Sequence, residues 1–202
     1  MNMLNVLVIE DSESDTNLVI RQLKKADYAI YHERVETADE MKAALDILVW
    51  DVIIADYKLP QFNAPAALTI LKKTGLDIPF IVVSGTIGEE IAVELMKSGA
   101  HDYLMKDKLI RLGPAVKREI AEAQMRQERQ KTEKALRASE ERYRILSEAA
   151  HEMIFIINKD DLVEYVNTSA AEFFHKRPED IIGKSRSLWF PLEVSRVNSA
   201  LC

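Results

Sequence analysis

Short apolar runs alternate with longer amphipathic stretches over residues 6–105, and this alternation limits the fold more than any other feature. The five apolar runs have the length of buried strands: Val6–Ile9, Ala29–Val35, Val52–Ala55, Phe80–Ser84 and Asp102–Met105. The four stretches between them carry apolar residues at helical spacing: Ser12–Lys25, Thr37–Leu48, Ala64–Thr74 and Glu89–Ser98. The pattern predicts an α/β fold, with a five-stranded parallel sheet covered by helices on both faces.

Local signals agree with these boundaries. Thr37 and Glu40 have the spacing of a capping box, and Gly99 stands where the fourth helix should end. The nearly continuous apolar runs Val6–Ile9 and Phe80–Val83 indicate strands that are buried on both sides. Because the chain has 202 residues, we expect two small domains rather than one large one.

From about Leu109 the pattern changes to a highly charged run, without Gly or Pro after Pro114, that extends to about Ala150. We expect one long helix here, with Pro114 in its first turn and a length of roughly 55–60 Å. Three pairs of opposite charge at i,i+4 would support it: Glu122/Arg126, Glu133/Arg137 and Glu140/Arg144.

A thin apolar seam runs along this expected helix. One set of residues keeps a 3.5-residue spacing: Met125, Thr132, Leu136, Ser139, Tyr143, Leu146 and Ala150. A second set follows a shifted frame, joined to the first by a stutter: Leu112, Val116, Ile120 and Ala123. Because so polar a helix is rarely stable alone, we expect a parallel coiled coil between two copies of the chain. A solvated monomeric helix is the alternative.

A second, small α+β module is expected after Ala150. Strand-like segments at Met153–Asn158 and Leu162–Asn167 flank a polar turn and predict a hairpin. A short helix is expected at Thr168–His175, followed by a second short element at Arg177–Gly183.

Charge balance and cysteine use exclude several classes of protein. The 27 basic and 33 acidic residues give a net charge of −6, which argues against nonspecific binding to nucleic acid or to an anionic membrane. The single cysteine, Cys202, excludes an intramolecular disulfide and fits a reducing cytoplasm. We expect no membrane span, because no run approaches the roughly 20 apolar residues required, and no signal peptide, because the N-terminus lacks a basic flank and a cleavage site.

Residues with reactive side chains follow four of the expected strands. They are Glu10 and Asp11 after the first strand, Asp56 after the third, Ser84 after the fourth and Lys106 after the fifth. In open parallel sheets, ligands bind beyond these carboxyl ends, where the strand order reverses. If the order is 2-1-3-4-5, as in a flavodoxin-like sheet, the first and third strands are neighbours and three carboxylates converge in one shallow pocket.

Three converging carboxylates require a cation, and Mg²⁺ is the expected ion because it prefers oxygen ligands. Lys106 supplies a second positive charge. Together they would allow a carboxylate to accept a phosphoryl group as an acyl phosphate, while Ser84 donates to a phosphoryl oxygen. Each residue alone has an ordinary explanation, such as helix capping by Glu10 and Asp11. The joint pattern indicates function.

Four segments at these strand ends match a known family pattern: Val8–Asp11, Asp51–Pro60, Val82–Thr86 and Asp102–Lys106. Through them, residues 1–120 resemble the receiver domain of bacterial and archaeal response regulators. The resemblance implies that a histidine kinase or phosphotransfer protein phosphorylates Asp56. It also implies roles for other residues: Glu10, Asp11, Asp56 and the Tyr57 carbonyl bind Mg²⁺, Ser84 and Tyr103 form a switch pair, Lys106 contacts the phosphoryl group, and Lys58 and Thr86 tune dephosphorylation.

Two departures from the family pattern lie in loops beside the expected pocket. The usual Lys-Pro is Lys106-Asp107 here, so a cis peptide bond after the lysine is not expected by default. A glycine common after Pro60 is replaced by the segment 61–65. These changes concern switching geometry more than phosphorylation.

The second module carries five segments of another pattern: Ser139–Leu146, His151–Ile157, Val163–Asn167, Ala170–Phe174 and Pro178–Lys184. Through them it resembles the first part of a PAS domain. PAS domains have a further three-stranded half, so the module looks truncated, and we assign it no sensory cofactor. Its edge strands would pair between chains or stay disordered.

The expected organisation is a receiver domain at 1–120, a coiled-coil-like linker at 121–142 and a PAS-like module at 143–202. One hypothesis is a signalling module that relays the state of Asp56 through the helix. The other is the N-terminal regulatory part of a hybrid histidine kinase or diguanylate cyclase, whose catalytic domain lies outside these residues. His151-Glu152 as a kinase phosphoacceptor is disfavoured because an apolar strand follows at once, and nucleotide binding because no glycine-rich loop follows the first strand.

Overall fold

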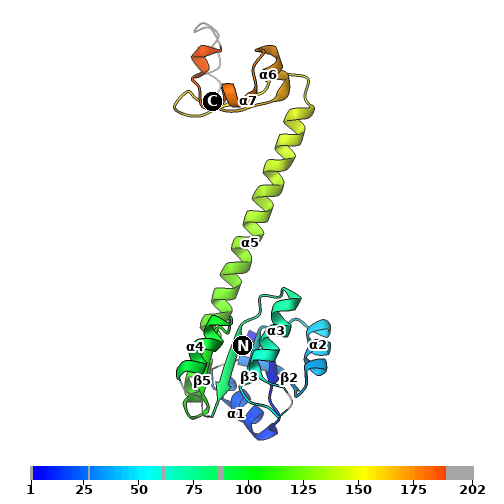
Figure 1. Ribbon diagram of the computed structural model, residues 1–202. Helices are drawn as coiled ribbons and strands as arrows, with labels where there is room; N and C mark the ends of the chain where they lie inside the picture. Colours follow the sequence, from blue (N-terminus) through cyan, green and yellow to red (C-terminus); the bar gives the residue numbers. More distant parts are fainter. Residues whose placement is uncertain (1, 27, 61, 86–88, 190–202) are drawn as a thin grey trace. The chain divides into compact units, whose positions relative to one another are not determined.

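The computed structural model describes residues 2–26, 28–60, 62–85 and 89–189 (Figure 1). The chain divides into two compact units, residues 1–130 and residues 131–202. We describe each unit by itself. The long helix α5 (Leu112–Ala149) contributes its first half to one unit and its second half to the other.

The first unit is built on a five-stranded parallel sheet in the order β2-β1-β3-β4-β5. This confirms the order predicted from the sequence. Its strands are β1 (Asn2–Ile9), β2 (Tyr28–Val35), β3 (Val52–Asp56), β4 (Phe80–Ser84) and β5 (Asp102–Met105). The helices between them are α1 (Glu13–Lys24), α2 (Ala38–Ile47), α3 (Ala64–Thr74) and α4 (Glu89–Lys97). The predicted capping box of α2 is present, with both Thr37 and Glu40 taking part.

Each face of the sheet has its own hydrophobic core, because successive side chains of a strand point to opposite faces. Val6 and Val8 pack with α1 and the start of α5 on one face. Leu7 and Ile9 pack with α2, α3 and α4 on the other. All four side chains are at most 1% exposed, so β1 is an interior strand that is buried on both faces.

A short 3-10 helix, η1 (Lys106–Arg111), connects β5 to α5. The long helix therefore starts at Leu112, three residues after the predicted start. Leu112 and Val116 are fully buried in the core that α1 also lines. Gly113 permits the close approach, since a Cβ there would lie 2.6 Å from the Cβ of Ala26. No cis peptide bond occurs among the described residues, including the bond between Lys106 and Asp107.

Only one of the three ion pairs expected on the long helix forms as predicted, that of Glu133 and Arg137 at 2.6 Å. Arg144 pairs with Glu141, three residues before it, instead of with Glu140, four residues before it.

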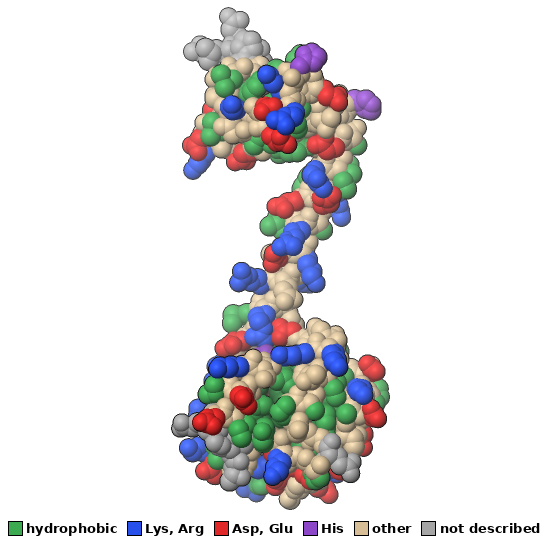
Figure 2. All heavy atoms as spheres, in the orientation of Figure 1, with side chains coloured by type: hydrophobic (Ala, Val, Ile, Leu, Met, Phe, Trp, Pro, Cys, Tyr) green, Lys and Arg blue, Asp and Glu red, His purple; other side chains and the backbone are tan. Residues whose placement is uncertain are grey.

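Arg126 does not pair with Glu122 but donates two hydrogen bonds, of 2.9 and 3.1 Å, to Asp77 in the loop before β4. A planar guanidinium is well suited to a two-point bond with a carboxylate. Side chains of both signs alternate along the exposed part of α5 (Figure 2).

His101 lies beside this anchor, with Nδ1 accepting a hydrogen bond from the Phe80 N–H at 3.1 Å and Nε2 at 3.3 Å from Arg126. Burial and the charge of Arg126 lower the pKa of His101, although Asp77, Glu119 and Glu122 act in the opposite direction. The folded state therefore favours the neutral form of the His101 ring.

We expect the free energy of unfolding to decrease as the pH is lowered below about 6.5. In that range His101 binds a proton more readily in the unfolded state than in the folded state. The stabilisation is present above the unfolded pKa and is lost as pH falls through the lowered folded pKa. Urea unfolding between about pH 7.5 and 5 measures this slope. His101→Gln should flatten it, and an equal slope in both proteins would contradict the assignment.

The second unit contains an antiparallel hairpin, β6 (Phe155–Ile157) and β7 (Val163–Val166), as predicted. Two short helices follow, α6 (Thr168–Phe173) and α7 (Pro178–Ile181), and then a 3-10 turn, η2 (Arg186–Leu188). A small core of five buried residues holds these elements together: Val163, Val166, Ala170, Ala171 and Ile181.

Asn167 is the polar centre of this unit and is completely buried. Its amide nitrogen donates to the carbonyls of Ser147 and Glu152, both at 2.9 Å. Its amide oxygen accepts from the N–H groups of Ile154 and Ala170. One side chain thereby joins the end of α5, the start of the hairpin and the N-terminus of α6.

We expect Asn167→Ala to destabilise the second unit by about 2–4 kcal/mol, because two carbonyls and two N–H groups lose their partner in a buried position. Hydrogen exchange of the amides in 150–185 measures the loss. Asn158→Ala, which removes a turn residue that caps the N–H groups of Asp160 and Leu162, should cost less. An equal effect of the two substitutions would contradict the central role of Asn167.

Candidate functional site

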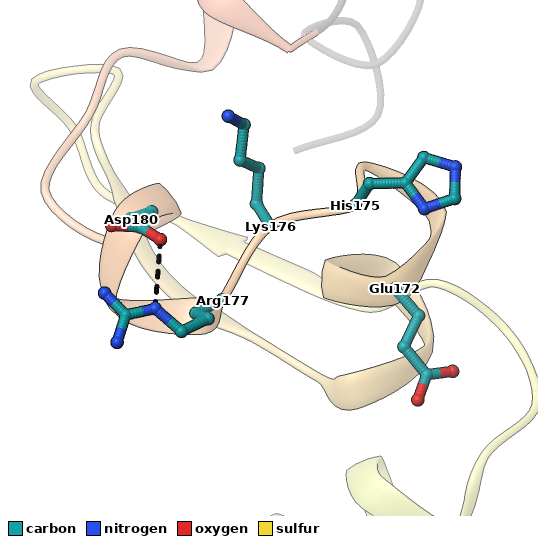
Figure 3. Close-up of a pocket in the computed structure, with 5 residues that line it drawn as sticks. All are labelled: Glu172, His175, Lys176, Arg177 and Asp180. Atoms are coloured by element: carbon teal, nitrogen blue, oxygen red, sulfur yellow. Dashed lines mark hydrogen bonds and ion pairs between the residues drawn. The ribbon is translucent and has the colours of Figure 1, made fainter.

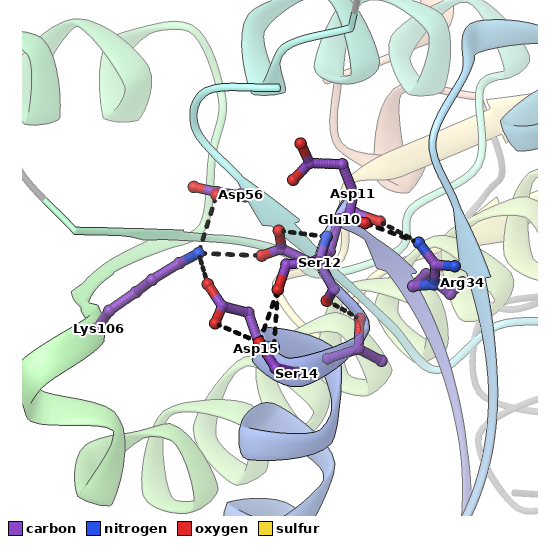
Figure 4. A network of polar contacts seen from close by, with 9 residues as sticks. Glu10, Asp11, Ser12, Ser14, Asp15, Arg34, Asp56 and Lys106 are labelled. Carbon is purple, nitrogen blue, oxygen red and sulfur yellow. Dashed lines mark hydrogen bonds and ion pairs between the residues drawn. The ribbon is translucent and has the colours of Figure 1, made fainter. Parts of the chain in front are cut away.

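The ammonium of Lys106 lies among three carboxylates at the carboxyl end of the first unit's sheet (Figure 4). Its Nζ is 2.9 Å from Asp56 Oδ2 and 3.1 Å from Glu10 Oε2, and it also contacts Asp15 Oδ2. The three carboxylates lie 50, 96 and 91 residues from Lys106 in the sequence. The sheet brings Asp56 and Glu10 to Lys106, and the first turn of α1 adds Asp15.

Strand order explains the convergence. β1 and β3 are neighbours, with Ile9 beside Ala55, so Glu10 and Asp56 leave the sheet side by side. Lys106 follows β5, and its long side chain reaches back past the end of β4. Two of the three carboxylates predicted to converge, Glu10 and Asp56, therefore meet at Lys106, whereas the Asp11 side chain does not bond to Lys106.

Burial and charge oppose each other at this site. The side chain of Glu10 is 5% exposed and that of Asp56 is 12% exposed. Burial raises the pKa of Glu10, against hydrogen bonds from the Ser12 N–H and from Lys106 that lower it. For Lys106, burial acts to lower the pKa, but the bonds to Asp15, Asp56 and Glu10 outweigh it and raise the pKa above its usual value. Lys106 is therefore a permanent positive charge here.

Asp11 is placed differently from Glu10. Asp11 is exposed, and it lines a pocket of about 220 Å³ together with Glu36, Thr37, Leu59 and Pro60. Its backbone is held by Arg34 at the end of β2, whose Nη1 donates to the carbonyls of Glu10 and Asp11 at 3.2 and 3.1 Å.

The loop after β3 is also fixed by backbone bonds. The Tyr57 N–H donates to the Val83 carbonyl at 3.0 Å, and the Tyr57 carbonyl accepts from the Ala64 N–H at 3.3 Å. A carbonyl oxygen has a second lone pair, so this bond does not prevent Tyr57 from binding a cation. Lys58, the next residue, is exposed.

Ser84 and Tyr103 lie on adjacent strands. Ser84 ends β4, is only 4% exposed and stands beside Met105 in the sheet register. The Tyr103 ring packs against the core that α2 and α3 line, and its hydroxyl donates to Met105 Sδ at 2.8 Å. Burial raises the pKa of Tyr103, and so does Asp107. Thr86 lies outside the described residues.

The donor groups at this edge suit Mg²⁺, because they are carboxylate and carbonyl oxygens from Glu10, Asp11, Asp56 and Tyr57. In the described part of the chain, no three His, Cys, Asp or Glu side chains are already arranged around a common point as metal ligands. The ammonium of Lys106 bonds to two of these oxygen donors, those of Glu10 and Asp56.

Sequence reasoning missed Asp15 and Arg34. Asp15 stands in the first turn of α1, three residues after the N-cap Ser12. Because α1 starts at the carboxyl end of β1, a carboxylate in its first turn faces the same edge as Glu10. That position was a usable signal. Arg34 had none, since it bonds to backbone carbonyls just after a neighbouring strand and to the side chain of Glu36, close to it in sequence.

A family model for the response regulator receiver domain matches residues 6–116. The chain belongs to this family. Receiver domains generally bind Mg²⁺ at their phosphorylation site and interact with histidine kinases or phosphotransfer proteins. A second model, for the PAS fold, matches residues 140–194, so the receiver is followed by a PAS segment of the kind found in two-component signalling. Both resemblances inferred from the sequence are confirmed.

Curated relatives are similar to part of this chain. Sensor kinase CckA of Brucella abortus is 30% identical over 106 residues, which are 50% of this chain and 11% of CckA. Cell cycle response regulator CtrA of Brucella ovis is 29% identical over 129 residues, which are 60% of this chain and 53% of CtrA. The chain thus spans less than two thirds of either relative.

Solved structures agree on the fold. The signal receiver domain of a Luxo repressor protein from Vibrio parahaemolyticus is 27% identical, with a TM-score of 0.55 over 62% of this chain and 95% of that one. A response regulator receiver domain protein from Clostridium thermocellum is 23% identical, with a TM-score of 0.52 over 60% of this chain and 98% of that one. The second likeness concerns the fold alone.

Two further observations bear on function. Within the described ranges, no helix combines the length and apolar character needed to cross a bilayer. The second unit has an open pocket of about 640 Å³ lined by Glu172, His175, Lys176, Arg177 and Asp180 (Figure 3). Its acidic and basic residues balance, and Arg177 already bonds to Asp180 at 3.3 Å. We assign this pocket no ligand.

We expect Lys106→Met to lower the free energy of unfolding by about 1–3 kcal/mol without Mg²⁺, because Glu10, Asp15 and Asp56 lose their common partner. The same substitution removes the ammonium that competes for these oxygens. Mg²⁺ should therefore raise the melting temperature of the variant more than that of the wild type. A variant whose melting temperature and Mg²⁺ response match those of the wild type would contradict this description.

Proposed function

We propose that Asp56 is the phosphoacceptor of this receiver domain. The observation that carries the proposal is the contact of Lys106 with both Asp56 and Glu10 at the end of the sheet, inside the matched residues. Glu10, Asp11, Asp56 and the Tyr57 carbonyl are the proposed ligands of Mg²⁺. When bound, the ion would offset negative charge on the phosphoryl group and orient it.

In the proposed reaction, a carboxylate oxygen of Asp56 attacks the phosphorus of the donor. The bond from phosphorus to the donor's leaving atom breaks, and its electron pair stays with the leaving group. An acyl phosphate forms on Asp56. Lys106 holds a positive charge beside the transferring group, and Ser84 donates its hydroxyl proton in a hydrogen bond to a phosphoryl oxygen.

Three further roles complete the proposal. Ser84 and Tyr103 act as the switch pair, because Ser84 stands at the pocket and Tyr103 lies on the adjacent strand. Lys58, exposed beside Tyr57, tunes dephosphorylation. Thr86, outside the described residues, shares that role by its sequence position.

Acetyl phosphate with Mg²⁺ should add one phosphoryl group to the wild-type chain, seen by intact-protein mass spectrometry. Asp56→Asn should abolish the addition, because an amide is not a nucleophile of this kind. Asp46→Asn, the same change at an exposed site on α2, is the matched control and should be labelled normally. Labelling of the Asp56 variant, or an unlabelled wild type, would refute the assignment.

We also propose the organisation 1–120 for the receiver, 121–142 for the linker and 143–202 for the PAS-like module, with α5 forming a parallel homodimer. Seam residues along α5 support the dimer because they are well exposed in the single chain: Met125 by 63%, Leu136 by 58%, Tyr143 by 71% and Leu146 by 63%. Apolar side chains spaced 3.5 residues apart are stabilised when a second helix covers them.

Light scattering of the whole chain should give the mass of a dimer. Leu136→Lys should shift the equilibrium strongly to the monomer, because it places a charge in the seam. Lys134→Ala, two residues away and outside the seam, should leave the dimer intact. A wild-type chain that stays monomeric at all concentrations would exclude the coiled coil.

The proposed partner is a histidine kinase or phosphotransfer protein in the cytoplasm, with phosphorylation relayed through α5. A second function has one observation in its favour, the match to a sensor kinase of which this chain spans 11%. The chain would then be the regulatory part of a longer hybrid kinase or a diguanylate cyclase. The reading frame after Cys202 distinguishes the two.

A further inference from the structure

Asp15 contacts Lys106 yet has no part in the phosphoacceptor chemistry proposed above. Its backbone is fixed in the first turn of α1, where its N–H donates to the Ser12 hydroxyl at 3.2 Å. Its side chain is 31% exposed, against 12% for Asp56 and 5% for Glu10. Asp15 is therefore the most exposed of the three carboxylates that bond to Lys106 (Figure 4).

The hydrogen-bonding capacity of Lys106 gives this contact a consequence. An ammonium has three N–H donors, and three carboxylates accept from Nζ in the structure: those of Glu10, Asp15 and Asp56. A phosphoryl oxygen on Asp56 that bonds to Lys106 must replace one of them. Glu10 is buried in the pocket and Asp56 carries the phosphoryl group. Asp15, the most exposed of the three, is the acceptor that leaves most easily.

The geometry points to Asp15 as a positioning residue that occupies the third N–H of Lys106 until a phosphoryl group takes it, and so slows phosphorylation of Asp56. This inference rests on the proposed function of Asp56. In the step concerned, a bond forms between an Asp56 oxygen and phosphorus, the bond to the acetate oxygen of acetyl phosphate breaks, and acetate leaves with the electron pair.

Charge acts in the same direction. Asp15 Oδ2 and Asp56 Oδ2 both bond to one nitrogen, so they are at most roughly 6 Å apart. A negative charge at that distance from the acceptor opposes the approach of an anionic donor. Asp15 thus restrains the reaction both through Lys106 and through its own charge, and the two contributions are separable.

The test measures the rate at which acetyl phosphate and Mg²⁺ phosphorylate the whole chain. Asp15→Asn and Asp15→Ala should both react faster than the wild type, by at least about threefold. Glu13→Gln removes the same charge from the same turn of α1 at an exposed position. It is the matched control and should react at close to the wild-type rate. Loss of a merely structural contact would slow the reaction or leave it unchanged.

A Lys106→Gln background separates the two contributions. If Asp15 acts through Lys106 as well as through its own charge, Asp15→Asn accelerates the reaction less in this background than in the wild type. An acceleration of equal size in both backgrounds, or in Glu13→Gln, would reduce the effect to charge and overturn the positioning role. A labelled wild type with unaccelerated Asp15 variants overturns this inference alone. An unlabelled wild type overturns the function of Asp56 and this inference together.

Discussion

The ammonium of Lys106 stabilises the cluster of carboxylates at the carboxyl end of the sheet. Strand order places Glu10 and Asp56 side by side, and α1 adds Asp15. Three like charges in a partly buried site repel one another strongly. One lysine that bonds to all three offsets this repulsion. The same arrangement leaves the carboxylates assembled in the position where the proposed Mg²⁺ ion and phosphoryl group would bind.

Lys106 also connects this site to the long helix. It is the first residue of η1, and η1 runs into α5 at Leu112. The start of α5 is held on the sheet by a buried core and, further along, by the bond of Arg126 to Asp77. A displacement of Lys106 on phosphorylation would therefore act on a short segment whose far end is packed. That gives the proposed relay a physical starting point within the first unit.

In the second unit, polar contacts rather than a large core hold the C-terminal end of α5. Asn167 bonds to the carbonyl of Ser147, while Glu148 accepts from the Tyr165 hydroxyl and from the N–H and hydroxyl of Thr168. The bonds of Thr168 and Tyr165 to Glu148 lower the pKa of its carboxyl, so it stays charged. Contacts of this kind depend on the relative placement of α5, β7 and α6.

The sequence by itself determined the elements and placed the proposed acceptor, Asp56, beside Glu10 and Lys106. The strands could be located because buried parallel strands are nearly continuously apolar, and Glu10, Asp56 and Lys106 because their strand ends share one edge. Tertiary structure decided the partners that packing brings together. Arg126 bonds to Asp77 rather than to Glu122, and Asp15 joins Lys106 from 91 residues away. No local spacing encodes such contacts, since they depend on how helices settle on the sheet and on which side chain then reaches which charge.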